Sequence, residues 1–137
     1  MGAVYADSSA LTKLVVEESE SGAVEAFVAN VQVLSSELAR AEIPRALRRI
    51  ASKDSSLSLE ELLRRSEELL DDLTLAPVER FTLEAAGELP DPGLRALDAV
   101  HVVTAIYLRP VDAFVTYDKR QAASARFAGL RTVAPGT

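Results

Sequence analysis

Leu94-Arg-Ala-Leu-Asp-Ala-Val-His-Val-Val-Thr-Ala-Ile-Tyr-Leu108 is the stretch around which the chain is organised, and apolar residues occupy nearly all of its positions. The polar exceptions Asp98, His101 and Thr104 are spaced three apart, so an α-helix places them along one stripe. The stretch predicts a helix that is buried on most of its surface and that begins just after the proline- and glycine-rich segment 90–93. Asp98 would then lie at the edge of a core, with no basic residue expected on its stripe. Such a charge needs hydrogen bonds, an opposite charge or a metal ion.

The composition is typical of a soluble globular protein. The 137 residues are 48% hydrophobic and 26% charged, and this length predicts a single domain spanning 1–137. No stretch reaches the roughly 20 apolar residues that a membrane span needs, and no signal peptide is recognisable, so we expect a cytoplasmic protein that does not enter a membrane. The absence of cysteine and the presence of one histidine exclude thiolate catalysis, disulfides and the common zinc sites.

The single histidine, His101, has two interpretations. A packed and hydrogen-bonded core residue is the more common role for a histidine on an apolar helix. However, a neutral imidazole one helical turn from Asp98 can also orient a metal-binding carboxylate.

Charge is distributed unevenly. The net charge of −6 would normally argue against a nucleic-acid ligand. Yet residues 95–137 carry six basic and three acidic side chains, and residues 36–53 carry five and two. Local basic surfaces can therefore lie beside an acidic centre.

Strands and helices are predicted to alternate. Short β-prone segments lie at Val4–Asp7, Val31–Leu34, Leu73–Val78, Asp112–Thr116 and Leu130–Val133. Segments with helical spacing of apolar residues lie at Ser8–Val15, Ala23–Val28, Ser36–Ala51, Ser58–Leu70, Arg80–Leu89, Leu94–Leu108 and Lys119–Phe127. Because no hairpin signal interrupts this order, we predict a single-domain, three-layer α/β/α fold with a central parallel sheet of about four to five strands.

Four carboxylates are candidates for one site. Asp7 and Asp118 each follow an apolar strand, and parallel strands present their carboxyl ends at the same edge of a sheet. Asp98 opens the helix before the second of these strands, and Glu42 lies beside the buried stripe of the helix at Ser36–Ala51. Without a metal, their mutual repulsion should raise their pKa values. A divalent cation would relieve it, and all-oxygen ligation favours Mg²⁺ or Mn²⁺ over zinc.

Each carboxylate also has a structural explanation. Asp98 can be held by backbone N–H groups at the start of its helix. Glu42 can form a surface ion pair with Arg45. Asp118 can pair with Gln121 in a capping box that starts the helix after it.

Four segments carry a family resemblance. Tyr5-Ala-Asp-Ser-Ser-Ala-Leu-Thr-Lys-Leu14, Glu37-Leu-Ala-Arg-Ala-Glu42, Leu97-Asp-Ala-Val-His-Val-Val-Thr-Ala105 and Val115-Thr-Tyr-Asp-Lys-Arg120 resemble the successive motifs of the VapC toxins. These toxins belong to the PIN-domain ribonucleases. The resemblance extends from one end of the chain to the other and implies that the α/β fold is PIN-like.

The resemblance also implies a function, namely the toxin of a type II toxin–antitoxin system that hydrolyses RNA as a Mg²⁺- or Mn²⁺-dependent endoribonuclease. The residues that match the family's acidic positions are Asp7, Glu42, Asp98 and Asp118. We expect Asp7 and Asp98 to be the main metal ligands, Glu42 to be a ligand or to orient a water, and Asp118 to bind a second metal. Ser9 and Thr116 match small hydroxyl positions near the metals.

The implied partners are an RNA substrate, a VapB-like antitoxin and a second copy of the chain in a homodimer. The basic candidates for contact with the RNA backbone are Arg40, Arg45, Arg48, Arg49, Lys119 and Arg120. The alternative is a PIN-like module that binds a metal or a partner without nuclease activity.

Overall fold

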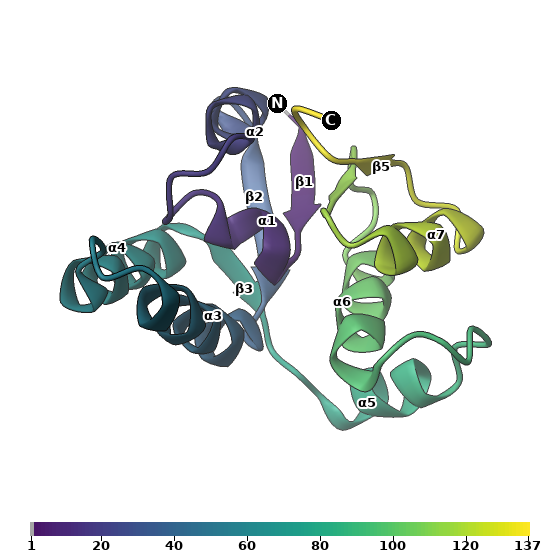
Figure 1. The fold of residues 1–137 in the computed structure, drawn as a ribbon. Coiled ribbons are helices and arrows are strands. Elements are labelled where there is room, and N and C mark those ends of the chain that lie inside the picture. Colours follow the sequence, from purple (N-terminus) through teal and green to yellow (C-terminus); the bar gives the residue numbers. More distant parts are fainter. Residues whose placement is uncertain (1) are drawn as a thin grey trace.

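A five-stranded parallel sheet forms the centre of the computed structural model, which describes residues 2–137 (Figure 1). The strands are β1 (Ala3–Ala6), β2 (Gln32–Ser36), β3 (Thr74–Ala76), β4 (Phe114–Val115) and β5 (Thr132–Val133). Their order in the sheet is β3-β2-β1-β4-β5, and every neighbouring pair is parallel. β1 is therefore the central strand.

Helices cover both faces of this sheet. They are α1 (Ser8–Thr12), α2 (Ser21–Val28), α3 (Ala39–Lys53), α4 (Leu59–Asp72), α5 (Arg80–Gly87), α6 (Ala96–Tyr107) and α7 (Lys119–Phe127). Figure 1 shows α3 and α4 on one side of the strands and α5, α6 and α7 on the other. The predicted three-layer α/β/α architecture is confirmed.

The alternating side chains of β1 belong to two separate hydrophobic cores. Successive side chains of a strand point to opposite faces of its sheet. Val4 and Ala6 accordingly pack in a core with Ile43 and Leu47 of α3, whereas Tyr5 packs in a second core with Phe114 of β4. All of these side chains are buried. The central strand therefore holds both helical layers.

The predicted central helix is present as α6, and seven of its twelve residues are buried. The predicted start of the helix at Ser36–Ala51 was wrong, because β2 continues to Ser36 and α3 begins only at Ala39. The Ser35 hydroxyl donates to the Ala6 carbonyl at 2.6 Å, and the Leu38 backbone N–H donates to the Ser36 hydroxyl at 3.1 Å. These bonds extend the strand and turn the chain before the helix begins.

None of the helices within residues 2–137 combines the length and the apolar character that crossing a bilayer requires.

Candidate active site

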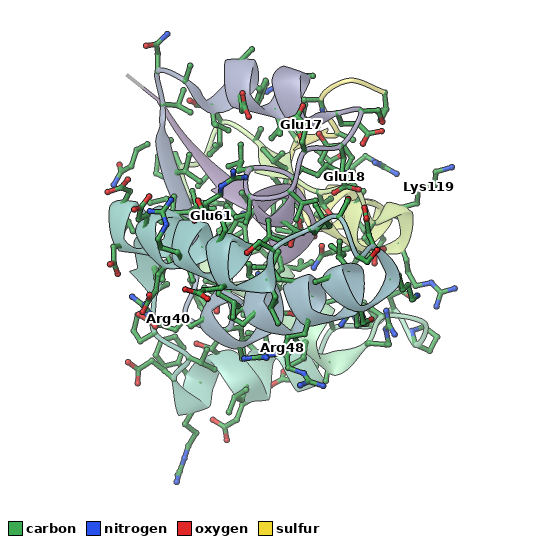
Figure 2. All side chains as sticks on the ribbon, turned by 60° about the vertical axis from the view of Figure 1, so that its left-hand side comes forward. Glu17, Glu18, Arg40, Arg48, Glu61 and Lys119 are labelled. Atoms are coloured by element: carbon green, nitrogen blue, oxygen red, sulfur yellow. The ribbon has the colours of Figure 1, made fainter. Side chains whose placement is uncertain are left out.

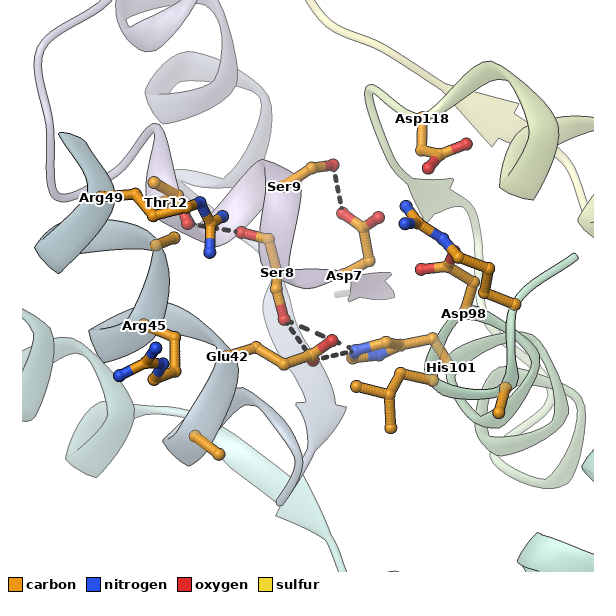
Figure 3. A pocket seen from close by; sticks show the side chains of 15 residues that line it. Asp7, Ser8, Ser9, Thr12, Glu42, Arg45, Arg49, Asp98, His101 and Asp118 are labelled. Atoms are coloured by element: carbon orange, nitrogen blue, oxygen red, sulfur yellow. Dashed lines mark hydrogen bonds and ion pairs between the residues drawn. The ribbon is translucent and has the colours of Figure 1, made fainter. Parts of the chain in front are cut away.

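A pocket of about 610 Å³ opens at the carboxyl ends of β1 and β4 (Figure 3). All four predicted carboxylates line it: Asp7, Glu42, Asp98 and Asp118. The first turn of α1 and the side of α3 form one wall, and the beginnings of α6 and α7 form the other. The ends of parallel strands thus bring together residues that lie far apart in the sequence.

Asp7 lies at the base of the pocket and is only 4% exposed. Its Oδ1 accepts hydrogen bonds from the Ser9 hydroxyl at 2.7 Å and from the Ala10 backbone N–H at 3.0 Å, so Asp7 caps α1. Its Oδ2 accepts a hydrogen bond from the Thr116 hydroxyl at 2.6 Å. Burial raises the pKa of the Asp7 carboxyl, although these hydrogen bonds oppose the rise.

Asp118 caps α7, as the sequence allowed. Its Oδ1 accepts from the backbone N–H groups of Arg120 at 2.9 Å and of Gln121 at 3.0 Å. The other half of the predicted capping box is absent, because the Gln121 side chain does not return to Asp118. Its Oε1 lies 3.0 Å from the Thr116 hydroxyl oxygen, whose single proton is donated to Asp7, and its Nε2 donates to the Asp98 carbonyl at 3.2 Å. Gln121 thereby ties α7 to the first turn of α6.

Asp98 faces the pocket from the first turn of α6, and its side chain is 24% exposed. Burial raises the pKa of its carboxyl, and the negative charge of Asp118 adds to the rise. The expectation that no basic residue shares its stripe was wrong. Arg95, three positions earlier, brings its Nε to 3.7 Å from Asp98 Oδ2. The Arg95 side chain is 87% exposed, so this ion pair is weak.

Glu42, on the α3 wall opposite Asp98, makes two short side-chain contacts. Its Oε1 accepts from the Ser8 hydroxyl at 2.6 Å and lies 2.6 Å from His101 Nε2. Burial alone would raise the pKa of the Glu42 carboxyl, but its contacts with His101 and Ser8 outweigh burial, and the pKa is lowered. The expectation that repulsion raises the pKa of every carboxylate therefore fails at Glu42. Its contact with His101 and Ser8 also replaces the surface pair that was predicted as an alternative.

His101 is the packed core residue that the sequence predicted, with 1% exposure. Its orienting contact is made to Glu42 and not to Asp98. Sequence reasoning missed Ser8 and Tyr5 as partners of this group, because both are more than 30 positions from the residues they contact. The one available signal was that a buried imidazole requires polar partners for both ring nitrogens.

The donor chemistry of the pocket fits a hard divalent cation. All four carboxylates offer oxygen, which Mg²⁺ and Mn²⁺ prefer. The negative charges of Asp98 and Asp118 interact unfavourably, and a cation would relieve that repulsion. Among residues 2–137, however, no three acidic or histidine side chains come close enough together to enclose one ion. The carboxylates share a pocket without forming a closed ligand set.

Comparison with known proteins gives the family. The PIN domain model matches residues 4–126, so the chain belongs to the PIN-domain family. Ribonuclease VapC46 of Mycobacterium tuberculosis is 39% identical over 137 residues, which cover 98% of this chain and 99% of that protein. Ribonuclease VapC47 of the same species is 31% identical, with 97% of each chain covered. Within the PIN-domain family the chain is therefore of the VapC type, as its four motifs predicted.

The fold also has a solved counterpart. The crystal structure of Mycobacterium tuberculosis VapC20, a sarcin-ricin loop cleaving toxin, matches with a TM-score of 0.71. The match covers 96% of this chain and 99% of that chain at 16% sequence identity. At this identity, the likeness establishes a shared fold.

The buried Asp7 carboxylate leads to a prediction about stability. Asp7→Asn should unfold at or above the wild-type temperature at neutral pH in EDTA. Burial raises the pKa of Asp7 above its unfolded value, so the contribution of Asp7 to wild-type stability is greatest at low pH and falls as the pH rises through the raised pKa. Asparagine does not titrate, and its Oδ1 can still accept from Ser9 and Ala10. In thermal melts, the unfolding temperature of the variant should therefore rise relative to that of the wild type as the pH increases from acidic to neutral.

Asp71→Asn is the matched control, because Asp71 is exposed on α4 and lies outside the pocket. The difference between its unfolding temperature and that of the wild type should not change with pH. A loss of about 1 kcal/mol in Asp7→Asn at every pH would mean that Asp7 acts only as a helix cap, and the prediction would be wrong.

Proposed function

We propose that this chain is a Mg²⁺- or Mn²⁺-dependent endoribonuclease, the toxin of a type II toxin–antitoxin system, and that it hydrolyses RNA phosphodiester bonds in the pocket between α3 and α6. The observation that carries the proposal is the gathering of Asp7, Glu42, Asp98 and Asp118 in one pocket. Membership of the VapC type supports it, because the matched relatives are named ribonucleases.

Asp7, Asp98 and Asp118 are the residues that we propose hold the metal, with side chains rotating towards the ion, because no three acidic side chains of residues 2–137 enclose an ion as they stand. A divalent ion bound there would lower the pKa of a bound water and neutralise charge on the phosphate. Asp7 is held by three hydrogen bonds and presents a fixed charge. Glu42 uses Oε1 for Ser8 and His101, and its Oε2 can orient the attacking water.

Basic side chains around the pocket suit an RNA backbone. Arg45 and Arg49 of α3 line the pocket wall (Figure 3). Arg95, which precedes α6, lines the pocket as well. Arg95 was not among the residues expected from the sequence. Arg40, Arg48, Lys119 and Arg120 are exposed, and Figure 2 shows the first three on the surface. Arg40 pairs with Glu37 and the Arg120 side chain donates to the Gly93 carbonyl, so we favour Arg45 and Arg49.

Cleavage of RNA should require the metal and Asp98. In Mg²⁺ the wild type should cut RNA, and in EDTA it should not. Asp98→Asn removes a charged metal ligand and should lower the rate by about 100-fold or more, with the fold intact by circular dichroism.

Asp91→Asn is the matched control, because the Asp91 side chain accepts a backbone bond within a turn and does not line the pocket. It should retain the wild-type rate. Cleavage that persists in EDTA, or equal losses in the two variants, would contradict the proposal. A folded wild type that binds Mg²⁺ and leaves RNA intact would favour the alternative of a binding module.

The proposed inhibitor is a VapB-like antitoxin that places an arginine or lysine against the acidic pocket, where charge-assisted bonds to carboxylates are strong. Co-expression with the neighbouring gene product should yield a stable, inactive complex. Asp98→Asn should weaken that complex in a titration, whereas Asp91→Asn should not. A chain that purifies alone and stays active beside that product would argue against this partner.

A homodimer is the proposed oligomeric state. Phe81 of α5 and Tyr107 of α6 are each 54% exposed, and their rings pack edge to face with centroids 5.2 Å apart. An exposed aromatic pair of this kind is suited to burial against a second copy. Light scattering should give a dimer for the wild type and a monomer for Phe81→Lys. Phe127→Lys, on α7, should remain dimeric, and a monomeric wild type would refute the proposal.

A further inference from the structure

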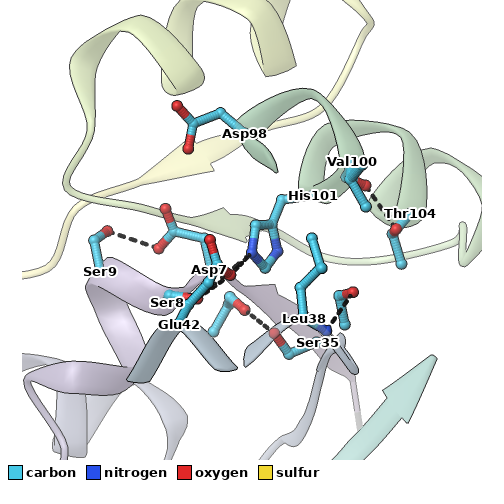
Figure 4. A network of polar contacts seen from close by, with 12 residues as sticks. Asp7, Ser8, Ser9, Ser35, Leu38, Glu42, Asp98, Val100, His101 and Thr104 are labelled. Atoms are coloured by element: carbon cyan, nitrogen blue, oxygen red, sulfur yellow. Dashed lines mark hydrogen bonds and ion pairs between the residues drawn. The ribbon is translucent and has the colours of Figure 1, made fainter. Parts of the chain in front are cut away.

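One hydrogen-bonded chain links the hydrophobic core to the pocket wall. The Tyr5 hydroxyl of β1 lies 2.7 Å from His101 Nδ1, and His101 Nε2 lies 2.6 Å from Glu42 Oε1 (Figure 4). The Ser8 hydroxyl donates to the same Glu42 oxygen at 2.6 Å. Tyr5 and His101 are almost completely buried, at 0% and 1% exposure. The chain therefore runs from the central strand through α6 to α3.

With a neutral imidazole at His101, the chemistry of these groups fixes where the protons lie. An ionised carboxylate can only accept, so the bond between His101 and Glu42 requires a proton on Nε2. A neutral imidazole carries one N–H, which leaves Nδ1 as an acceptor. The Tyr5 hydroxyl must then donate to Nδ1.

The core leaves the Tyr5 hydroxyl little freedom. Its ring stacks on Phe114 with centroids 5.3 Å apart and an interplanar angle of 9°. The same ring makes a T-shaped contact with the His101 ring, with centroids 5.8 Å apart and an interplanar angle of 70°. Two aromatic contacts therefore set the position from which the hydroxyl reaches Nδ1.

We infer that Tyr5 and His101 are positioning residues: Tyr5 selects the Nε2–H tautomer of His101, and His101 holds Oε1 of Glu42 so that Oε2 is left for the reaction. Among the described residues, the hydrogen bonds to Glu42 fall on Oε1. This inference rests on the proposed function, because it assigns Glu42 a role at the reacting water. A structural role alone would require partners for the buried imidazole but would not make the rate depend on its tautomer.

Nitrogen NMR of ¹⁵N-histidine-labelled protein in EDTA tests the proton assignment without RNA. His101 is the one histidine of the sequence, so its two ring nitrogens give an unambiguous pair of signals. In the wild type, Nε2 should carry the proton and Nδ1 should not. Tyr5→Phe should shift the Nδ1 signal towards a mixture of tautomers. An Nδ1–H form or an imidazolium in the wild type, or an unchanged spectrum in Tyr5→Phe, would overturn the inference.

Tyr117→Phe is the matched control, because the Tyr117 hydroxyl also makes one 2.7 Å bond, to the Pro135 carbonyl. It should leave the His101 signals unchanged. Comparable chemical-shift dispersion in the three proteins verifies that they are folded, and the wild-type spectrum tests the tautomer whether or not Tyr5→Phe folds.

Kinetics test the positioning role. Tyr5→Phe should lower kcat about 10-fold with KM unchanged, because its hydroxyl does not line the pocket. His101→Gln can place an amide N–H near the Nε2 position and should retain more activity than His101→Asn, whose shorter amide cannot reach Glu42. Wild-type kcat in Tyr5→Phe, or equal losses in the two His101 variants, would refute the role. A wild type that never cuts RNA refutes the proposed function instead, and the NMR result remains interpretable.

Discussion

A charge removed from water at the centre of the sheet is the constraint on which the pocket depends. Asp7 is stable there because three donors from two segments meet its two oxygens: Ser9 and Ala10 of α1, and Thr116 after β4. Thr116 also accepts from the Asp118 backbone N–H at 3.0 Å, so one hydroxyl joins the Asp7 carboxylate to the backbone of Asp118. The requirement to solvate Asp7 thus fixes the geometry where β1, α1 and α7 meet.

The two walls of the pocket differ electrostatically. On the α3 wall, Glu42 is matched by an imidazole and a hydroxyl, and its pKa is lowered. On the α6 and α7 wall, Asp98 faces Asp118, and its pKa is raised by burial and by that neighbour. The exposed Arg95 offsets this repulsion only weakly. A cation would therefore relieve the most electrostatic repulsion on the second wall. On the first wall, hydrogen bonds already hold the Glu42 carboxylate in place.

Local patterns predicted the fold and the edge of the sheet where the carboxylates lie, because alternation and helical spacing are properties of neighbouring residues. Helix boundaries were less predictable: Ser36 stays in β2 because it pairs with Ala76 of β3, a contact that only the folded chain reveals. The contacts of Glu42 were not predictable at all. Ser8 and His101 lie 34 and 59 positions from it, and no periodic pattern encodes such pairs. Arg95 was overlooked although its spacing from Asp98 is local.

Gln121 gives the second wall a further property. It is completely buried, and its amide holds the Asp98 carbonyl while its own backbone N–H binds Asp118. These contacts fix the backbone of Asp98 against the start of α7, but neither of them holds the Asp98 carboxylate itself. The folded chain therefore places two like charges on one wall before any ligand arrives. What is preorganised is the backbone of this wall, and rotation of the side chains is what remains for closing a ligand set around a cation.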